Sequence, residues 1–299
     1  MPLISWFDRS TVRHLRLPFS FFLLPVYLFA LSQAKIIDWH STWAGFIILH
    51  FLVFPSTNGY NSYQDRDETS IGGLKHPPQV NSHLFWVTLL FDIIAVTGGL
   101  FISMRFSVMV LIFITMSRLY SFRGIRLKKY PIIAFIIVFI FQGAFVYLMA
   151  SESIFSQPIS NHFSYTSLLC MAISSFFIGS MYPLTQIYQH EADKKDGVIS
   201  LSYLLGYRGT FLFSGMLFSL ATFLLFFHLF MEQQLLHLIL FIFFLLPVTI
   251  RLARWFSSVR KDKTHANYEN TMALNLLSSV CMNLYFITLV INNQTSLFR

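Results

Sequence analysis

Charged residues and cysteines are both scarce in this sequence. Aspartate and glutamate together number 13 among 299 residues, and only 11% of the chain is charged. Hydrophobic residues make up 55% of the chain, and its mean hydropathy is +0.62. This composition excludes an ordinary soluble globular domain and is typical of a polytopic membrane protein. The two cysteines, Cys170 and Cys281, lie in apolar stretches, so we interpret them as packing residues rather than as a disulfide or a metal site.

Nine stretches approach the roughly 20 apolar residues that a helix needs to cross a bilayer core. They are residues 17–34, 42–62, 83–104, 106–121, 130–150, 163–188, 207–230, 234–252 and 267–291. We therefore expect a single all-α, membrane-embedded domain over residues 1–299, with nine transmembrane helices. Residues 1–16 form a basic amphipathic segment, which we expect on the cytoplasmic membrane surface with Trp6 and Phe7 among the lipid headgroups.

Positive charges are distributed unevenly between the two sides that these stretches define. Of the 21 lysines and arginines, all but Lys35, Arg105 and Arg299 lie in the N-terminal segment or in the connections after the second, fourth, sixth and eighth stretches. The positive-inside rule places this crowded side in the cytoplasm, with the N-terminus inside and the C-terminus outside. Membrane topology thus accounts for the net charge of +8, and we expect no nucleic acid partner. The basic run Arg251–Lys263 is expected to contact anionic membrane lipid.

Six of the thirteen acidic residues are concentrated in two short segments on the predicted cytoplasmic side. The first acidic segment, Asn58–Pro78, contains Asp65, Asp67 and Glu68, and the second, Gln189–Gly197, contains Glu191, Asp193 and Asp196. If the second and sixth stretches continue as helices, each places one amide and two acidic side chains on one face at i, i+4 and i+7. These residues are Asn61, Asp65 and Glu68 in the first segment, and Gln189, Asp193 and Asp196 in the second. The repeated spacing also suggests a duplicated architecture.

Hard oxygen ligands of this kind suit Mg²⁺, which proteins commonly hold with one or two carboxylates and a substrate phosphate. Five cations between Arg118 and Lys129 lie on the same predicted side and are suited to binding a multiply charged anion. The alternatives are solvated helix ends for the acids and ordinary positive-inside topology for each individual cation. The acidic segments are expected to converge on one site.

Two groups of polar residues within the apolar stretches leave two interpretations open. Asp92 lies in the third stretch, where it is expected either to bond a neighbouring helix or to face an active cavity. The ninth stretch and its start contain the amides Asn267, Asn270, Asn275 and Asn283. These amides either bond other helices or line a cavity.

The nine stretches, the two acidic segments and the basic segment after the fourth stretch together resemble the UbiA superfamily of intramembrane prenyltransferases. Members have nine transmembrane helices and two aspartate-rich motifs, Asn-Asp-x-x-Asp-x-x-x-Asp and Asp-x-x-x-Asp. The stretch Ala192–Gly206 also resembles the family's continuation after the second motif. The resemblance covers most of the chain.

The sequence departs from these motifs at three positions. The matching positions are Asn61, Asp65 and Asp193. Ser62 and Thr69 replace aspartates of the first motif, and Gln189 replaces the earlier aspartate of the second. The acidic residues available to compensate are Asp67, Glu68, Glu191 and Asp196. These departures leave open how many metal ions the protein holds.

The resemblance implies Mg²⁺-dependent transfer of a prenyl group from a prenyl diphosphate to an aromatic or other lipophilic acceptor. The implied metal ligands are Asp65, Asp67, Glu68, Asp193 and Asp196. The implied diphosphate-binding residues are Arg126, Lys128, Arg66 and Lys194. Asn61, Asp65 and Asp193 are the implied catalytic residues, with Asn61 orienting a ligand or phosphate. The alternatives are an ion-coupled transporter or lipid-handling protein, and a catalytically silent member of the same superfamily.

Overall fold

The computed structural model describes residues 6–155 and 163–295, which are almost entirely helical. The elements are α1 (Arg9–Leu15), η2 (Leu17–Phe22), α2 (Leu24–Ser32), α3 (Trp39–Ile47), η3 (Ile48–Val53), α4 (Phe54–Asp65), α5 (His83–Gly99), α6 (Met104–Ser121), η4 (Leu127–Lys129), α7 (Pro131–Val138), η5 (Phe139–Phe145), α8 (Val146–Ile154), α10 (Tyr165–Gln186), α11 (His190–Lys195), α12 (Leu201–Met231), α13 (Leu235–Lys261), η6 (Lys263–His265) and α14 (Tyr268–Thr295). The predicted all-α fold is confirmed. Residues 1–5 of the predicted amphipathic segment and the C-terminal Arg299 lie outside the described residues.

Each of the nine predicted stretches coincides with one helix or with consecutive helical segments. Within residues 6–155 and 163–295, seven helical runs are long and apolar enough to cross a membrane. The remaining two are the run α3–η3–α4 and α5, which has only 17 residues. The protein is thus a multi-pass membrane protein, and the number of nine membrane spans stays a prediction.

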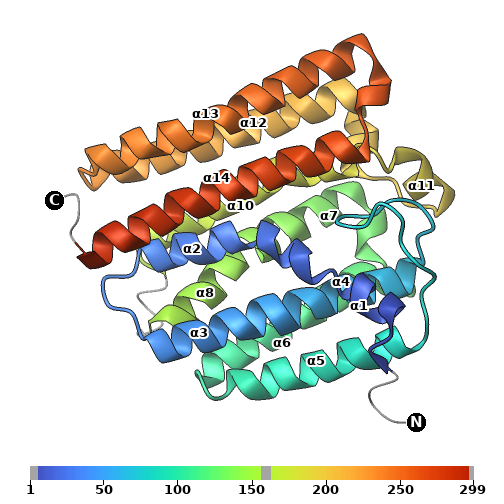
Figure 1. Cartoon of the computed structure of the whole chain (residues 1–299), viewed down its shortest axis with the longest axis horizontal. Helices are drawn as coiled ribbons and strands as arrows, with labels where there is room; N and C mark the ends of the chain where they lie inside the picture. The colour runs from blue at the N-terminus through green and yellow to red at the C-terminus, as the bar shows by residue number, and fades with distance from the viewer. Residues whose placement is uncertain (1–5, 156–162, 296–299) are drawn as a thin grey trace.

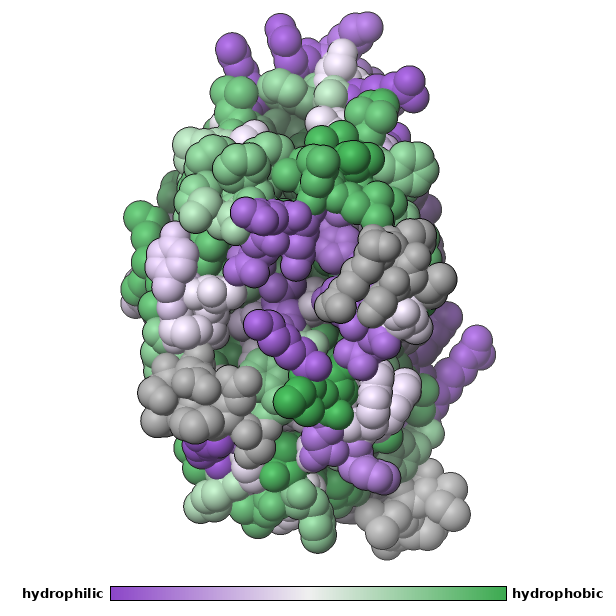
Figure 2. All heavy atoms as spheres, turned by 90° about the vertical axis from the view of Figure 1, so that its left-hand side faces the viewer, coloured by the Kyte–Doolittle hydropathy of each residue, from purple (hydrophilic) through white to green (hydrophobic). Residues whose placement is uncertain are grey.

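The long helices lie side by side along the longest axis of the molecule, so their connections gather at its two ends (Figure 1). α10 packs against α12 and η5, and α14 packs against α13 and α2. One end, on the right in Figure 1, carries α1, α11 and the connections rich in lysine and arginine. Figure 2 looks onto the opposite end, where hydrophilic side chains gather at the centre between hydrophobic flanks.

The crossing of η5 and α10 shows how one close approach positions part of the interior. η5 is a π-helical segment of seven residues between α7 and α8. A Cβ added at Gly143 would lie 2.4 Å from the Cα atom of Ser175 in α10, so only glycine fits there. Ser175 Oγ in turn accepts a hydrogen bond from the Ala144 N–H at 3.0 Å. Segments of this kind change the helical register, often at functional sites, and here the preceding residue, Gln142, lines a cavity.

Candidate active site

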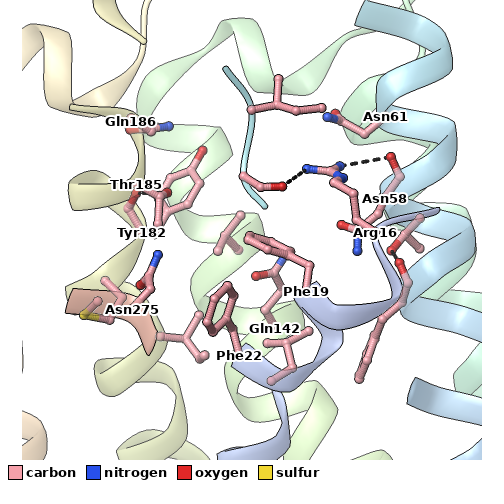
Figure 3. Close-up of a pocket in the computed structure, with 18 of the residues that line it drawn as sticks. Arg16, Phe19, Phe22, Asn58, Asn61, Gln142, Tyr182, Thr185, Gln186 and Asn275 are labelled. Carbon is pink, nitrogen blue, oxygen red and sulfur yellow. Dashed lines mark hydrogen bonds between the residues drawn. The ribbon is translucent and has the colours of Figure 1, made fainter. Parts of the chain in front are cut away.

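A cavity of about 360 Å³ opens among the helices at the basic end of the molecule. Residues of both acidic segments and of the connection after α6 line it, as does α14. Eight phenylalanines line it as well: Phe19, Phe22, Phe29, Phe54, Phe113, Phe177, Phe218 and Phe286. The cavity therefore combines charged groups with an apolar lining. Figure 3 shows Asn61 and Gln186 in its upper part and Phe22, Gln142 and Asn275 in its lower part.

The first acidic segment leaves its helix immediately after Asp65. The next residue, Arg66, has left-handed backbone angles, with φ 55° and ψ 43°, and its N–H bonds Ser62 O at 2.9 Å. Such a residue ends an α-helix, so the prediction that Asn61, Asp65 and Glu68 share one helix face is wrong. Asp65 and Asp67 line the cavity, whereas Arg66 and Glu68 are exposed and are not among its lining residues.

The second acidic segment is also not a continuation of the preceding helix. α10 ends at Gln186, and a separate short helix, α11, begins at His190. The predicted uninterrupted helix through Asp196 is therefore wrong, because the chain turns between the two helices. Three of its residues, Gln189, Asp193 and Asp196, nevertheless line the cavity. Glu191 and Lys194 are exposed and are not among the lining residues.

Two cations from the connection after α6 lie between the acidic segments. Arg126 forms ion pairs with Asp65 and with Asp196, and its Nη1 also donates to the Asp196 carbonyl at 3.0 Å. Lys128 pairs with Asp65, and its Nζ lies 3.4 Å from Asn61 Oδ1. The Asn61 oxygen also accepts a hydrogen bond from Ser121 at 2.9 Å. The structure thus brings together seven of the predicted site residues: Asn61, Asp65, Asp67, Arg126, Lys128, Asp193 and Asp196.

Two of these carboxyl groups hold protons more tightly than usual. Burial raises the pKa of Asp67 to about 6, and the nearby Asp65 charge adds to the effect. Burial also raises the pKa of Asp193 to about 7, with further contributions from Asp67 and Asp65, although Lys128 opposes the shift. The negative charges therefore repel one another within the cavity, and a cation bound between them would relieve this repulsion.

The donor set is compatible with Mg²⁺ held partly by a ligand. Within the described part of the chain, no three His, Cys, Asp or Glu side chains are grouped closely enough to hold an ion by themselves. Asp67 nevertheless lies close enough to Asp193 for its charge to raise the pKa of Asp193, and both side chains line the cavity. Mg²⁺ commonly binds through one or two carboxylates, several waters and substrate phosphate. The carboxylates of the two segments fit that mode of binding.

Arg16 is a cavity residue that the sequence did not distinguish from the other N-terminal cations. Only 8% of its surface is exposed, and its guanidinium donates to Gly72 O at 3.1 Å and to Asn58 O at 3.0 Å (Figure 3). A Cβ at Gly72 would lie 2.7 Å from the Phe19 ring, so the connection packs directly on η2. The N-terminal segment therefore holds the connection that carries Asp67.

Gln189 lines the cavity and also joins the two acidic segments. Its Nε2 donates to the Ser70 carbonyl at 3.2 Å, which joins the two acidic segments directly. An aspartate at this position has no N–H to donate. The departure from the motif is thus accompanied by a hydrogen bond between the segments that an aspartate side chain cannot form.

Asp92 lies apart from the cavity. Arg118 Nε donates to its carboxylate at 3.1 Å, and Ser56 Oγ also donates to it. Arg118 stacks over the Tyr60 ring at 3.8 Å from the ring centre. Asp92 is not among the cavity-lining residues, so of its two predicted environments the hydrogen-bonded contact with neighbouring helices is confirmed.

Comparison with known proteins gives a family and a fold. The UbiA prenyltransferase family model matches residues 19–277. A solved UbiA homologue from Archaeoglobus fulgidus, bound to GPP and Mg²⁺, is similar with a TM-score of 0.65 and 16% identity, over 94% of this chain and 99% of that chain. An apo UbiA homologue from Aeropyrum pernix K1 is similar with a TM-score of 0.64 and 16% identity, over 90% of this chain and 97% of that chain. A structure of digeranylgeranylglyceryl phosphate synthase is similar with a TM-score of 0.58 and 18% identity, over 95% of this chain and 98% of that chain. No curated protein sequence matches the chain.

Proposed function

Because this chain belongs to the UbiA prenyltransferase family, we propose that it transfers a prenyl group from a prenyl diphosphate to a lipophilic acceptor within the membrane, with Mg²⁺ as cofactor. The observation that carries the proposal is the composition of the cavity described above. Carboxylates and cations gather where Arg126 and Lys128 meet the acidic segments, and eight phenylalanines also line the cavity. A molecule with a charged head and a hydrocarbon tail matches both parts.

Structures of relatives support the choice of substrate class and cofactor. Two structures of the A. fulgidus homologue contain Mg²⁺ together with GPP or DMAPP, which are prenyl diphosphates. In this chain, the acidic residues Asp65, Asp67, Asp193 and Asp196 line the cavity and would hold the metal. Glu68 is exposed, so we no longer include it among these ligands.

Arg126 and Lys128 are suited to bind the diphosphate. Both cations are largely buried, with side-chain exposures of 11% and 12%, and charge interactions are stronger there than at a solvated surface. A bound diphosphate would compete with Asp65 and Asp196 for these cations. Arg66 and Lys194 are exposed outside the cavity lining, so we no longer assign them this function.

In the proposed reaction, the bond between prenyl C1 and the diphosphate oxygen breaks, and the diphosphate leaves with the electron pair. A nucleophilic atom of the acceptor forms the new bond to C1 and then loses a proton. Mg²⁺, when bound, supplies positive charge to the leaving diphosphate. The phenylalanines exclude water from the positively charged prenyl carbon, and Arg126 and Lys128 stabilise the developing negative charge.

The proposal is tested with purified protein and labelled prenyl diphosphates of several chain lengths, in Mg²⁺ or in EDTA. We expect Mg²⁺-dependent release of diphosphate together with a prenylated lipophilic product. Arg126→Ala should raise the KM for the diphosphate substrate without changing membrane insertion. Ion-coupled flux without diphosphate release would instead indicate a transporter. Binding of the diphosphate without turnover under any condition would indicate a silent member of the family.

A further inference from the structure

The last turns of α13 carry exposed cations at the basic end of the molecule. Within the run Arg251–Lys263, Arg251 donates to Asn270 Oδ1 at 2.8 Å, which joins α13 to α14. The other cations of the run are exposed, and so is one arginine near the start of α12. We call these exposed residues the basic patch: Arg208, Arg254, Arg260, Lys261 and Lys263.

Arg208 belongs to the patch because α12 and α13 run antiparallel, side by side (Figure 1). The two helices are consecutive, and only residues 232–234 join them. Phe211 of α12 stacks on Phe256 of α13, with the ring centres 5.0 Å apart. Arg208 lies one turn before Phe211, and Arg260 lies one turn after Phe256, with its guanidinium 5.9 Å from that ring centre. Both arginines are therefore at the same end of the helix pair.

The basic patch differs from the cations beside the cavity because it has no acidic partners. Lys128, for example, pairs with Asp65. None of the patch cations forms an ion pair with another residue of the described ranges. Asp262, the one acid within the run, accepts hydrogen bonds from the Thr264 N–H and hydroxyl at 2.9 and 2.7 Å. The positive charge of the patch is therefore available to an external anion.

An exposed apolar stripe leads into the patch along one face of α13. Exposed residues follow one another at intervals of three or four positions, which places them on one face of the helix. They are Phe243, Leu246, Ile250, Arg254, Ser257 and Lys261. α13 packs against α14 and α12, and Trp255 and Val259 are buried on its other side. The exposed face is thus apolar up to Ile250 and cationic from Arg254 onward.

The change along this face occurs where the hydrocarbon of a bilayer meets the headgroups. α13 has 27 residues, so at 1.5 Å per residue it is about 40 Å long, which exceeds the roughly 30 Å of a hydrocarbon core. With the apolar stripe in the hydrocarbon, Arg254 lies about 6 Å beyond Ile250. Side chains of a helix point toward its N-terminus, so Lys261 reaches back toward Ser257. The cations therefore lie at the level of the lipid phosphates.

We infer that this face of α13 binds an anionic phospholipid of the adjacent leaflet. Its acyl chains pack along the apolar stripe, and its phosphate accepts hydrogen bonds from Arg254, Ser257 and Lys261. A nucleic acid or an acidic protein would match the cations alone and leave the apolar stripe without a partner. The positive-inside rule accounts for the number of cations at this end, but it does not account for their alignment with exposed apolar residues.

The test uses the full-length protein in detergent with an equimolar mixture of phosphatidylglycerol and phosphatidylcholine that have the same acyl chains. Native mass spectrometry counts the lipids that stay bound. We expect about a tenfold preference for phosphatidylglycerol, because at least two cations attract its net negative charge. A photoactivatable phosphatidylglycerol should cross-link within residues 243–261, whereas cross-links confined to other helices would contradict the assigned location.

Substitutions then assign the preference to the basic patch. Arg254→Gln combined with Lys261→Gln should reduce the preference to within about twofold. This variant keeps the other three cations of the run, so the positive-inside signal persists. The matched control combines Arg9→Gln with Arg13→Gln, which removes the same charge from two exposed arginines of α1, a helix that packs against α4 and α5. The control should retain the full preference.

A further comparison separates a lipid site from a site for any phosphate. Glycerophosphoglycerol carries the same headgroup without acyl chains, and we expect it to compete at least about a hundredfold more weakly than the lipid. Equal competition would overturn the inference, because the apolar stripe would then contribute nothing. Equal retention of the two lipids by the unmodified protein would also overturn it, as would an equal loss of preference in both double variants. None of these measurements involves turnover, so their outcome is independent of the proposed prenyl transfer.

Discussion

The two acidic segments have similar residue spacings but different structures. The first segment is part of α4 up to Asp65, and after Asp65 it continues as a connection that Arg16 holds by hydrogen bonds. The second begins after a turn and forms the short, separate helix α11. The spacing of the acids indicated neither outcome. Backbone geometry made the difference, at the left-handed Arg66 in one case and at the end of α10 in the other.

Asp65 of the first segment and Asp193 of the second also differ in how their charges are neutralised. Asp65 pairs with both Lys128 and Arg126. Asp193 has no ion pair among the described residues, and its pKa is raised to about 7. The charge of Asp65 is therefore balanced within the protein, whereas the charge of Asp193 depends on pH and on what binds in the cavity.

The largest expected effect separates catalysis from stability. Asp65→Ala and Asp193→Ala should each reduce prenyl transfer roughly a thousandfold, because the proposed Mg²⁺ site would lose one of its carboxylate ligands in a water-poor cavity. Asp65→Ala alone should also destabilise the fold, by about 3 kcal/mol, since Lys128 then lacks its buried counter-ion. Diphosphate release and thermal unfolding measure the two effects. Glu68→Ala, at an exposed site, serves as the control and should change neither; equal destabilisation in Asp65→Ala and Asp193→Ala would contradict the comparison.

The next effect tests how the first segment is held. Arg16→Met removes two hydrogen bonds from a buried cation to the carbonyls of Gly72 and Asn58. We expect a loss of stability of about 3 kcal/mol, and a fall in turnover at saturating substrate because Asp67 is no longer held in place. Hydrogen exchange across residues 66–78 should increase. The matched control, Arg13→Met, replaces an exposed arginine of α1 and should have no effect on exchange in this region.

A smaller effect concerns Mg²⁺ and pH. The raised pKa values of Asp67 and Asp193, about 6 and about 7, mean that the folded protein binds protons more tightly than the unfolded chain. Without metal, these two groups therefore contribute less to stability as the pH rises from about 4 to about 7. Mg²⁺ must displace the same protons, so its half-saturating concentration should fall by about tenfold per proton displaced for each pH unit across this window. Isothermal titration at several pH values measures this, and Asp193→Asn should flatten the upper part of the curve.

The smallest effect asks whether the second segment can be made more like the family motif. Gln189→Asp adds a carboxylate and removes the hydrogen bond to Ser70. We expect Mg²⁺ affinity to increase about threefold to tenfold, because one more negative charge attracts the ion. Turnover should fall slightly as the two segments lose their direct bond. Gln189→Glu is a useful companion, and unchanged Mg²⁺ affinity in both variants would show that this position lies outside the metal environment.

Much of the fold was predictable because hydrophobic length and charge distribution determine it. The helical stretches follow from the length of the hydrophobic runs. The convergence of Asp65, Asp193 and Arg126 follows from their predicted position on one common side of the membrane. The sequence could not show that Arg66 ends its helix, because most arginines occupy ordinary helical angles. Nothing in the sequence separated Arg16 from Arg13, or Asn275, which lines the cavity, from Asn283, which is not among its lining residues. In each of these pairs, the difference is which neighbours the folded helices supply.

The contact between Asp92 and Arg118 has a consequence for how the protein is made. Asp92 lies in the middle of α5, and Arg118 lies near the end of α6, the next helix in the chain. Each charged side chain alone makes entry of its helix into lipid costly, and α5 has only 17 residues. Helices that neutralise each other are expected to leave the insertion machinery together as a hairpin. The ion pair is thus expected to favour insertion of α5 and α6 as one unit, in addition to joining the two helices.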